Sequence, residues 1–457
     1  MRIRIKKNKK RTHIRNYYST YPKIVALSFF LIIIIGTGLL MLPVSVKDGS
    51  VSFIDALFTA TSATCVTGLV QFDTFTKWTL FGQIVILCMI QIGGLGFITL
   101  TMLLARFVKQ RVSVKQKILL KESIGSIFTG DLKKLGKTVI GGTAFFEIMG
   151  AVLLSIHFIP QMNFKNGLYT SVFLSVSAFC NAGFDVMGRI EAGSSLVTVN
   201  DSPLVLLTIS ALIIIGGIGF IVWDDIRENK FNFKKYSFHT KITLSVTAVL
   251  LFAGTVLYYI FEANNTLADM SFGKGLLNAF FTSTTTRTAG FNSVSTGDMT
   301  GASKMLTYML MFIGGSSGST AGGIKTSTFA VICMAVVSVI KQSDTCERFG
   351  RRVSDEYIRK AVAVFFTNLS LVFISSFIIS AVQPSLDYFD VLFECFSAMG
   401  TVGMSTGITA SLSLVSKIVI TALMFIGRVT SLIFVFTFRF DINKKSVLKP
   451  LGNLLVG

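Results

Sequence analysis

Four short segments, spread along the whole chain, share a pattern that is suited to binding a dehydrated cation. Each follows an apolar or hydroxyl-rich stretch, ends in a single glycine and precedes a long hydrophobic run. Converging backbone carbonyls can replace the water shell of an ion, and glycine accepts the backbone angles that such a lining needs. The candidate ion-binding residues end these glycine segments: Val66, Thr67, Gly68, Asn181, Ala182, Gly183, Thr288, Ala289, Gly290, Thr401, Val402 and Gly403.

The number of glycine segments matters more than any one of them. Glycine after threonine or alanine is common, so a single segment could equally be a turn in an extracellular loop. Four are expected if one polypeptide encloses one ion path. The fourth, Thr401-Val402-Gly403, also matches the first three letters of the potassium-channel filter sequence. We therefore predict that the backbone carbonyls of these residues bind K⁺.

A second glycine motif follows each segment in nearly constant register. Its copies begin at Gly93, Gly216, Gly314 and Gly427, which lie 25, 33, 24 and 24 residues after the segment glycines. Close packing between helices is an alternative use of these glycines, but it does not explain the shared register. The motif indicates that the chain repeats one unit four times.

The composition indicates that these units lie in a membrane. The chain is 51% hydrophobic and 14% charged, with a mean hydropathy of +0.68; a soluble protein would be roughly a quarter charged. Several apolar runs reach about 20 residues, enough to span a bilayer core. We predict an all-α polytopic membrane protein with eight spans: 23–43, 78–106, 136–159, 203–223, 238–261, 304–340, 358–382 and 413–438.

Each pair of spans is separated by a segment too short to cross the membrane, which is typical of a re-entrant pore helix. These segments are 53–64, 167–179, 275–286 and 387–399. We predict four pseudo-symmetric helix–pore-loop–helix repeats around one central pore. The predicted parts are a basic N-terminus (1–20), repeat 1 (21–110, with Gly68), repeat 2 (111–230, with Gly183), repeat 3 (231–345, with Gly290 and an intramembrane loop at 314–323), repeat 4 (346–440, with Gly403) and a C-terminal tail (441–457).

The net charge of +20 is a topology signal and does not indicate nucleic acid binding. Basic clusters recur at 1–15, 106–137, 227–241, 348–360 and 439–449, whereas the other loops are nearly neutral or acidic. Positive loops stay in the cytoplasm, so we predict a multi-pass protein of the cell membrane with both termini inside. The six cysteines form no C-x-x-C pair and are predicted to be small buried apolar residues.

A glycine-rich loop is predicted inside the sixth span. Residues 314–323 read GGSSGSTAGG, begin about 15 Å into that span by helical rise, and should not form a helix. Non-helical backbone is tolerated at that depth only where protein or water satisfies it, so we predict a plug below the glycine segments. A flexible kink is the alternative. The predicted gate residues are Gly314, Gly315, Ser316, Ser317, Gly318, Ser319, Thr320, Gly322, Gly323 and Arg428.

Arg428 is predicted to lie near the middle of the last span, eleven residues after Lys417. Insertion scales assign a penalty of about 2.5–3.5 kcal/mol to an arginine at that depth. In the alignment of the four repeats, Arg428 lies at the level of Gly94, Gly217 and Gly315, so its charge is a candidate electrostatic barrier in a cation pore. It could also donate hydrogen bonds to loop carbonyls around 315–319. The alternative is a structural pair with Glu147 or Glu394. The roles of Glu147, Glu394, Arg287 and Lys325 stay open, with snorkelling as an alternative for Lys325.

The chain resembles the Trk/Ktr/HKT superfamily of potassium transporters, and within it the membrane subunit of bacterial Ktr uptake systems. The resemblance rests on the glycine segments, the glycine-rich third inner helix and the arginine in the last inner helix. The resemblance runs from about Tyr21 to the C-terminus. It implies potassium uptake through a gated, channel-like pore in each protomer of a homodimer. It also implies a cytoplasmic nucleotide-binding regulator ring of the KtrA/KtrC kind. Glycine at Gly68 matches the potassium-type members; sodium as an activator stays open, and no organic cofactor is expected in this chain.

Two other classes of function compete with a channel-like pore. A secondary-active K⁺/Na⁺ or K⁺/H⁺ symporter with alternating access would have inverted halves with helices broken at matching positions, whereas only the sixth span is predicted to be strongly broken. An intramembrane enzyme would need a nucleophile with a base, or a metal cluster, in the spans, and the sequence shows neither. The chain is therefore predicted not to be an enzyme.

Overall fold

The structure is a computed structural model that describes residues 26–107, 132–230, 232–343 and 345–429. Within these ranges the regular secondary structure is helical, apart from one hairpin of two short strands, β1 (Glu347–Arg348) and β2 (Arg351–Arg352). The predictions for residues 1–20, 111–131 and 441–457 lie outside the described residues, as do those for the ends of the first and last spans.

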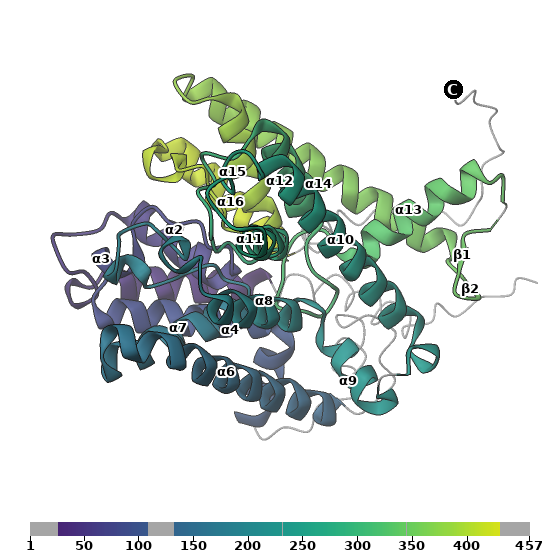
Figure 1. Ribbon diagram of the computed structural model, residues 1–457, viewed down its shortest axis with the longest axis horizontal. Helices are drawn as coiled ribbons and strands as arrows, with labels where there is room; N and C mark the ends of the chain where they lie inside the picture. Colours follow the sequence, from purple (N-terminus) through teal and green to yellow (C-terminus); the bar gives the residue numbers. More distant parts are fainter. Residues whose placement is uncertain (1–25, 108–131, 231, 344, 430–457) are drawn as a thin grey trace, which may run out of the picture.

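Long apolar helices alternate with short ones along the chain (Figure 1). In chain order they are Ala26–Leu40, η1 (Pro43–Ser45), α2 (Phe53–Cys65), α3 (Thr74–Lys77), α4 (Leu80–Phe107), α6 (Leu132–Met162), α7 (Phe164–Phe179), η2 (Met187–Arg189), η3 (Val197–Val199), α8 (Pro203–Gly217), α9 (Phe220–Asn229), η4 (Phe233–Lys235), α10 (Phe238–Glu262), α11 (Phe272–Thr285), α12 (Gly301–Phe312), α13 (Thr326–Ile340), α14 (Asp355–Val382), α15 (Tyr388–Gly400), η5 (Ile408–Ser411) and α16 (Leu414–Val429).

The short helices α2, α7, α11 and α15 coincide with the predicted pore segments to within three residues at each end. Side chains of Ser52, Asn163 and Asp387 cap three of them by accepting backbone N–H groups of the first turn, which supplies partners for donors that a helix leaves unpaired. Their C-terminal halves are mostly buried; in α15 every residue from Val391 to Gly400 is buried. The interior of the molecule is therefore built around the ends of these helices.

Apolar side chains cover much of the outer surface, as expected where lipid replaces water. Phe252 on α10 and Phe377 on α14 are 73% and 74% exposed. Three described helices, α6 from Thr138 onward, α10 and α14, are long and apolar enough to cross a membrane, and α8 with α9 forms a fourth candidate that is bent by 94°. The molecule is thus a helical protein with an apolar exterior.

The prediction that only the sixth span is strongly broken is wrong. The segment 203–223 is not one helix, because α8 ends at Gly217 and α9 starts at Phe220 at a steep angle. The sixth span is also not the only broken one, because Gly96 interrupts α4 with φ 66° and ψ −172°. Gly96 and Gly219 occupy the same place in the second glycine motif, and both adopt a positive φ that residues with a β-carbon rarely take.

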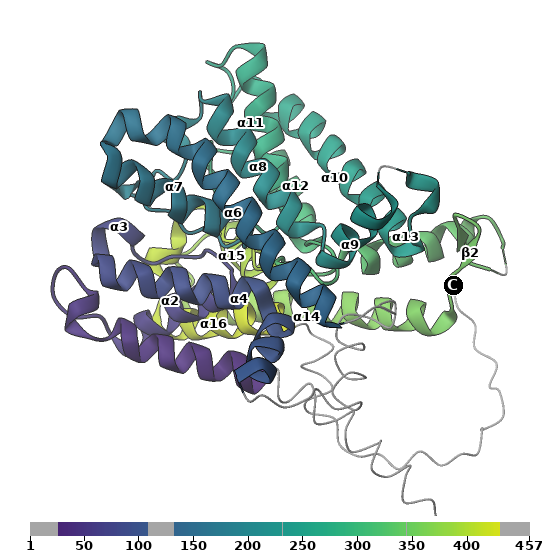
Figure 2. The same ribbon diagram turned by 90° about the horizontal axis from the view of Figure 1, so that it is seen from below.

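The helices close into a ring that brings the two ends of the described chain together. α4 contacts α7, α8 contacts α11, α12 contacts α15, and α16 returns to contact α2. Figure 2 shows α2 beside α16, although the two helices lie at opposite ends of the colour scale. The ends of the four short helices therefore surround one region.

The cysteine prediction is wrong for two of the six residues. Cys65, Cys180, Cys346 and Cys395 are buried, but Cys88 and Cys333 are exposed. Both lie on apolar helices whose outer faces are uncovered in this chain, so hydrophobic surroundings in the sequence did not indicate burial.

Candidate functional site

The four glycine segments share an unusual backbone conformation. Two residues before each segment glycine, Val66, Asn181, Thr288 and Thr401 have φ of 57°, 59°, 74° and 50°. A left-handed conformation is uncommon for a residue with a side chain, and is most unfavourable for β-branched ones. The segment glycines follow with φ of 94°, 71°, 81° and 92°. The same strained pattern at four equivalent places indicates a functional constraint.

The segment glycines lie together in cyclic order. A β-carbon built on each would come within 3.0 Å of a carbonyl oxygen in the next segment, closer than real side chains approach. The pairs are Gly68 with Ala182, Gly183 with Ala289, Gly290 with Val402, and Gly403 with Thr67. The last pair closes the ring, so the carbonyl oxygen before each glycine lies against its neighbour around a narrow centre.

Serine residues of the short helices hold the backbone amides of two segments. The N–H groups of Thr67 and Gly68 donate to the carbonyl and hydroxyl of Ser62 at 2.8 and 3.1 Å. Ser397 accepts the corresponding pair in the fourth segment at the same distances. These amides are thereby paired in both segments, which leaves the carbonyl oxygens of the two segments available. The sequence analysis missed these serines; their position six residues before Gly68 and Gly403 was the available signal.

The predicted break in the sixth span is present. α12 ends at Phe312 and α13 starts at Thr326, and the residues between them form no helix. The N–H groups of Ser316 and Thr320 donate to the carbonyls of Gly217 and Gly216 at 3.0 and 3.3 Å. The glycine-rich loop therefore pairs with carbonyls at the end of α8, which explains how non-helical backbone is tolerated there.

The glycine-rich loop also touches the glycine segments. A β-carbon on Gly322 would overlap the side chain of Thr401. The Thr320 hydroxyl donates to the Asn181 side-chain oxygen at 3.2 Å, and the Asn181 amide donates to the Thr288 hydroxyl at 3.3 Å. Asn181 thus connects the loop to the second and third segments, a role that the sequence did not indicate.

Arg428 is buried among backbone carbonyls. Its guanidinium donates to the carbonyls of Thr320 and Gly93, and to that of Gly94 at 3.3 Å. The predicted contact with the glycine-rich loop is therefore made at Thr320, just beyond residues 315–319, and α4 supplies the rest. Among the described residues Arg428 has no ion-pair partner, so the alternative pairing with Glu147 or Glu394 is not what the structure contains.

The remaining buried charges have local partners. Glu147 accepts from the Gln91 amide at 3.3 Å, and Glu394 accepts from the Thr409 hydroxyl at 3.0 Å. Arg287 is 8% exposed and donates to the Thr247 hydroxyl at 3.4 Å. Lys325 does not snorkel, because its ammonium donates to the carbonyls of Ala321 and Gly322 at 2.8 and 3.3 Å. It therefore holds the C-terminal end of the glycine-rich loop.

Comparisons with known proteins identify the family of this chain. Residues 5–447 match the family model TrkH, described as cation transport protein. The potassium/sodium uptake protein NtpJ of Enterococcus hirae is 40% identical over 429 residues, 92% of this chain and 93% of that protein. The Ktr system potassium uptake protein B of Bacillus subtilis is 39% identical over 440 residues, 96% and 97% of the two chains.

A solved structure shares the fold. The potassium transporter TrkH from Vibrio parahaemolyticus superimposes with a TM-score of 0.73 over 92% of this chain and 84% of the other, at 18% sequence identity. The family model covers nearly the whole chain, and the relatives align along most of their own length. This chain belongs to the TrkH family of cation transport proteins.

Proposed function

We propose that this chain takes up potassium across the cell membrane through one central, gated pore, as the translocating subunit of a Ktr-type system. The ring of segment glycines is the observation that carries the proposal. A narrow ring of backbone carbonyls, with the amides held away by the short helices, is the arrangement that replaces the hydration shell of K⁺. The names of the two relatives, both uptake proteins for potassium, support the choice of ion.

The proposed topology has eight spans in four repeats, with both termini in the cytoplasm. The repeated order of short helix, glycine segment and apolar helix supports it, as does the closure of α16 onto α2. In this arrangement the glycine-rich loop lies on the cytoplasmic side of the ring and closes it, and Arg428 holds the loop through Thr320.

The partners are a second copy of this chain and a cytoplasmic ring of nucleotide-binding regulator subunits. The B. subtilis relative is named as one component of a Ktr system, which implies further components. Sodium is also proposed as an activator; the E. hirae relative is named for the uptake of both ions. Affinity purification of the native membrane complex should recover a nucleotide-binding protein with this chain.

The test of the pore is flux through purified protein in liposomes. Gly183→Ala and Gly290→Ala should abolish most rubidium uptake, because each new β-carbon meets the carbonyl oxygen of the next segment. Gly273→Ala is the matched control, because it lies on the short helix α11 with nothing within 4 Å. Wild-type uptake in the two ring variants, at equal protein content, would contradict the carbonyl ring.

A secondary-active symporter with alternating access is the second candidate. It is favoured by the breaks at Gly96, at Gly219 and at residues 313–325, because helices broken at matching levels are typical of such transporters. Flux that saturates at low potassium and strictly requires a counter-transported or co-transported ion would support it. Flux that rises in proportion to potassium and follows the membrane potential alone would support the pore.

A further inference from the structure

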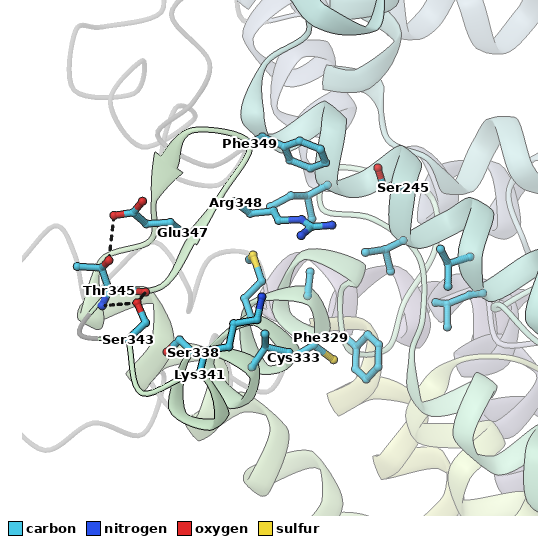
Figure 3. Close-up of a pocket in the computed structure, with 17 residues that line it drawn as sticks. Ser245, Phe329, Cys333, Ser338, Lys341, Ser343, Thr345, Glu347, Arg348 and Phe349 are labelled. Atoms are coloured by element: carbon cyan, nitrogen blue, oxygen red, sulfur yellow. Dashed lines mark hydrogen bonds between the residues drawn. The ribbon is translucent and has the colours of Figure 1, made fainter.

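A groove separate from the glycine segments lies between α10, α13 and the β1–β2 hairpin (Figure 3). Its volume is about 520 Å³, within the range of sites for small organic molecules. None of its lining residues belongs to the glycine segments or to the glycine-rich loop. The proposed pore therefore does not account for it.

The walls of the groove are apolar. Ile242, Val246 and Val249 of α10 line one side, and Phe329 and Val337 of α13 line the other. Val249 and Val337 are 64% and 47% exposed, so these walls are open to whatever surrounds the protein. In a membrane-spanning chain the surroundings of an open apolar wall are acyl chains.

One end of the groove is basic. Lys341 follows α13 directly and Arg348 lies on β1, and Figure 3 shows both charged groups directed into the same space. The Glu347 side chain is turned away, and accepts a hydrogen bond from the Thr345 hydroxyl at 2.9 Å. Within the described part of the chain, neither Lys341 nor Arg348 has an ion-pair partner. Two converging cations at the mouth of an apolar groove form a site for an amphiphilic anion.

We propose that this groove binds an anionic phospholipid of the cytoplasmic leaflet. Its phosphate lies between Lys341 and Arg348, and one acyl chain runs along the walls formed by α10 and α13. Basic pockets between membrane helices on the cytoplasmic side suit such head groups. A soluble anion would make no use of the apolar walls, and an apolar protein segment would make none of the two cations. The choice of leaflet rests on the proposed topology.

The lipid would also position an element of the gate. α13 begins at Thr326, directly after Lys325, which holds the glycine-rich loop. An occupant that bridges α10 and α13 therefore fixes the helix on which the loop ends.

The test is lipid binding to the purified full-length protein, measured by native mass spectrometry with phosphatidylglycerol and phosphatidylcholine of the same acyl composition. The wild type should bind phosphatidylglycerol more tightly. Each cation near an anionic head group contributes about fivefold in affinity, so Lys341→Gln with Arg348→Gln should weaken phosphatidylglycerol binding roughly 25-fold. Phosphatidylcholine binding should change little.

Arg351→Gln with Arg352→Gln is the matched control. It removes the same amount of charge, from the hairpin that also carries Arg348, but these residues are exposed on β2 and do not line the groove. This control should weaken phosphatidylglycerol binding by less than the loss of one of the two cations that line the groove. Val249→Trp is a second variant that fills the apolar part without altering charge, and it should weaken binding of both lipids.

Three results would overturn the proposal. They are equal affinity of the wild type for both lipids, equal loss in the two double variants, or a Val249→Trp protein that binds lipid normally but no longer pairs with a second copy. The last result would assign the groove to the partner copy. These readouts count bound lipid and the number of copies in the complex and do not use flux, so they stand apart from the test of potassium uptake.

Discussion

Arg428→Ala should increase potassium flux per molecule, because the guanidinium ties the glycine-rich loop to the helices around it. Its donors reach the Thr320 carbonyl of the loop and the carbonyls of Gly93 and Gly94 on α4. Alanine releases the loop and also removes a buried positive charge from the proposed cation path.

The size of the effect follows from the bond to Thr320. A hydrogen bond from a charged donor contributes about 1.5–3 kcal/mol. If that bond forms only in the closed state, its loss shifts the balance toward the open state by roughly 10- to 150-fold. The gain in flux is smaller where the open fraction approaches its maximum. Three carbonyls also lose a donor, so the amount of folded protein should fall.

Arg428→Lys separates charge from geometry. One ammonium keeps the positive charge but lacks the planar fork that reaches the loop and α4 together, so flux should rise less than in the alanine variant. Lys417→Gln is the control on the same helix; its partner is Asp55, at 2.7 Å, and it should leave flux per molecule near the wild-type value.

The assay is rubidium uptake into liposomes, normalised to folded protein from size-exclusion chromatography. Unchanged or lower normalised flux in Arg428→Ala, with potassium still preferred over sodium, would refute a gating role for Arg428. The residue would then act only to satisfy the carbonyls around it.

Three further predictions follow from the same geometry. Gly68→Ser should weaken potassium uptake and let sodium compete better, because the new side chain meets the Ala182 carbonyl at a φ of 94°; unchanged potassium affinity and sodium competition would exclude Gly68 from the ring. Deleting residues 316–319 should raise flux and reduce its dependence on any regulator, whereas an inserted, folded deletion with wild-type flux would mean that the loop only packs. Burial, with the nearby charge of Asp73, raises the pKa of Asp185 to about 6, so the folded state holds this proton more tightly than the unfolded state. The stability of the fold should therefore decrease as pH rises from about 4 to 6. Asp185→Asn should remove this pH dependence in a thermal-denaturation series.

The short helices and the break in the sixth span could be predicted from local sequence. A dozen apolar residues bounded by capping side chains form a helix that is too short to cross a bilayer, and a run such as 314–323 has too many glycines to remain helical. The bends at Gly96 and Gly219 had a signal of the same kind, the third glycine of the repeated motif. That signal was insufficient because a lone glycine is often tolerated in a helix, and only packing forces the positive φ.

The partners of the polar side chains could not be predicted. Arg428 binds carbonyls 335 and 108 positions away in sequence, and Asn181 connects elements separated by 107 and 139 residues. Which donor meets which carbonyl depends on how α16, α4 and the loop pack against one another. Sequence reasoning therefore identified Arg428 as important but left a buried acid as its alternative partner.

The sequence by itself determined the type of protein, the positions of the four short helices to within three residues and the glycines that follow them, because these depend on apolar length and on the conformational freedom of single residues. The tertiary structure decided that the four glycines meet in one ring and that the last helix returns to the first. It also decided that Arg428 holds the loop and that a basic-ended groove opens beside α13. Each of these joins residues far apart in the chain, and only the packing of the helices brings such residues together.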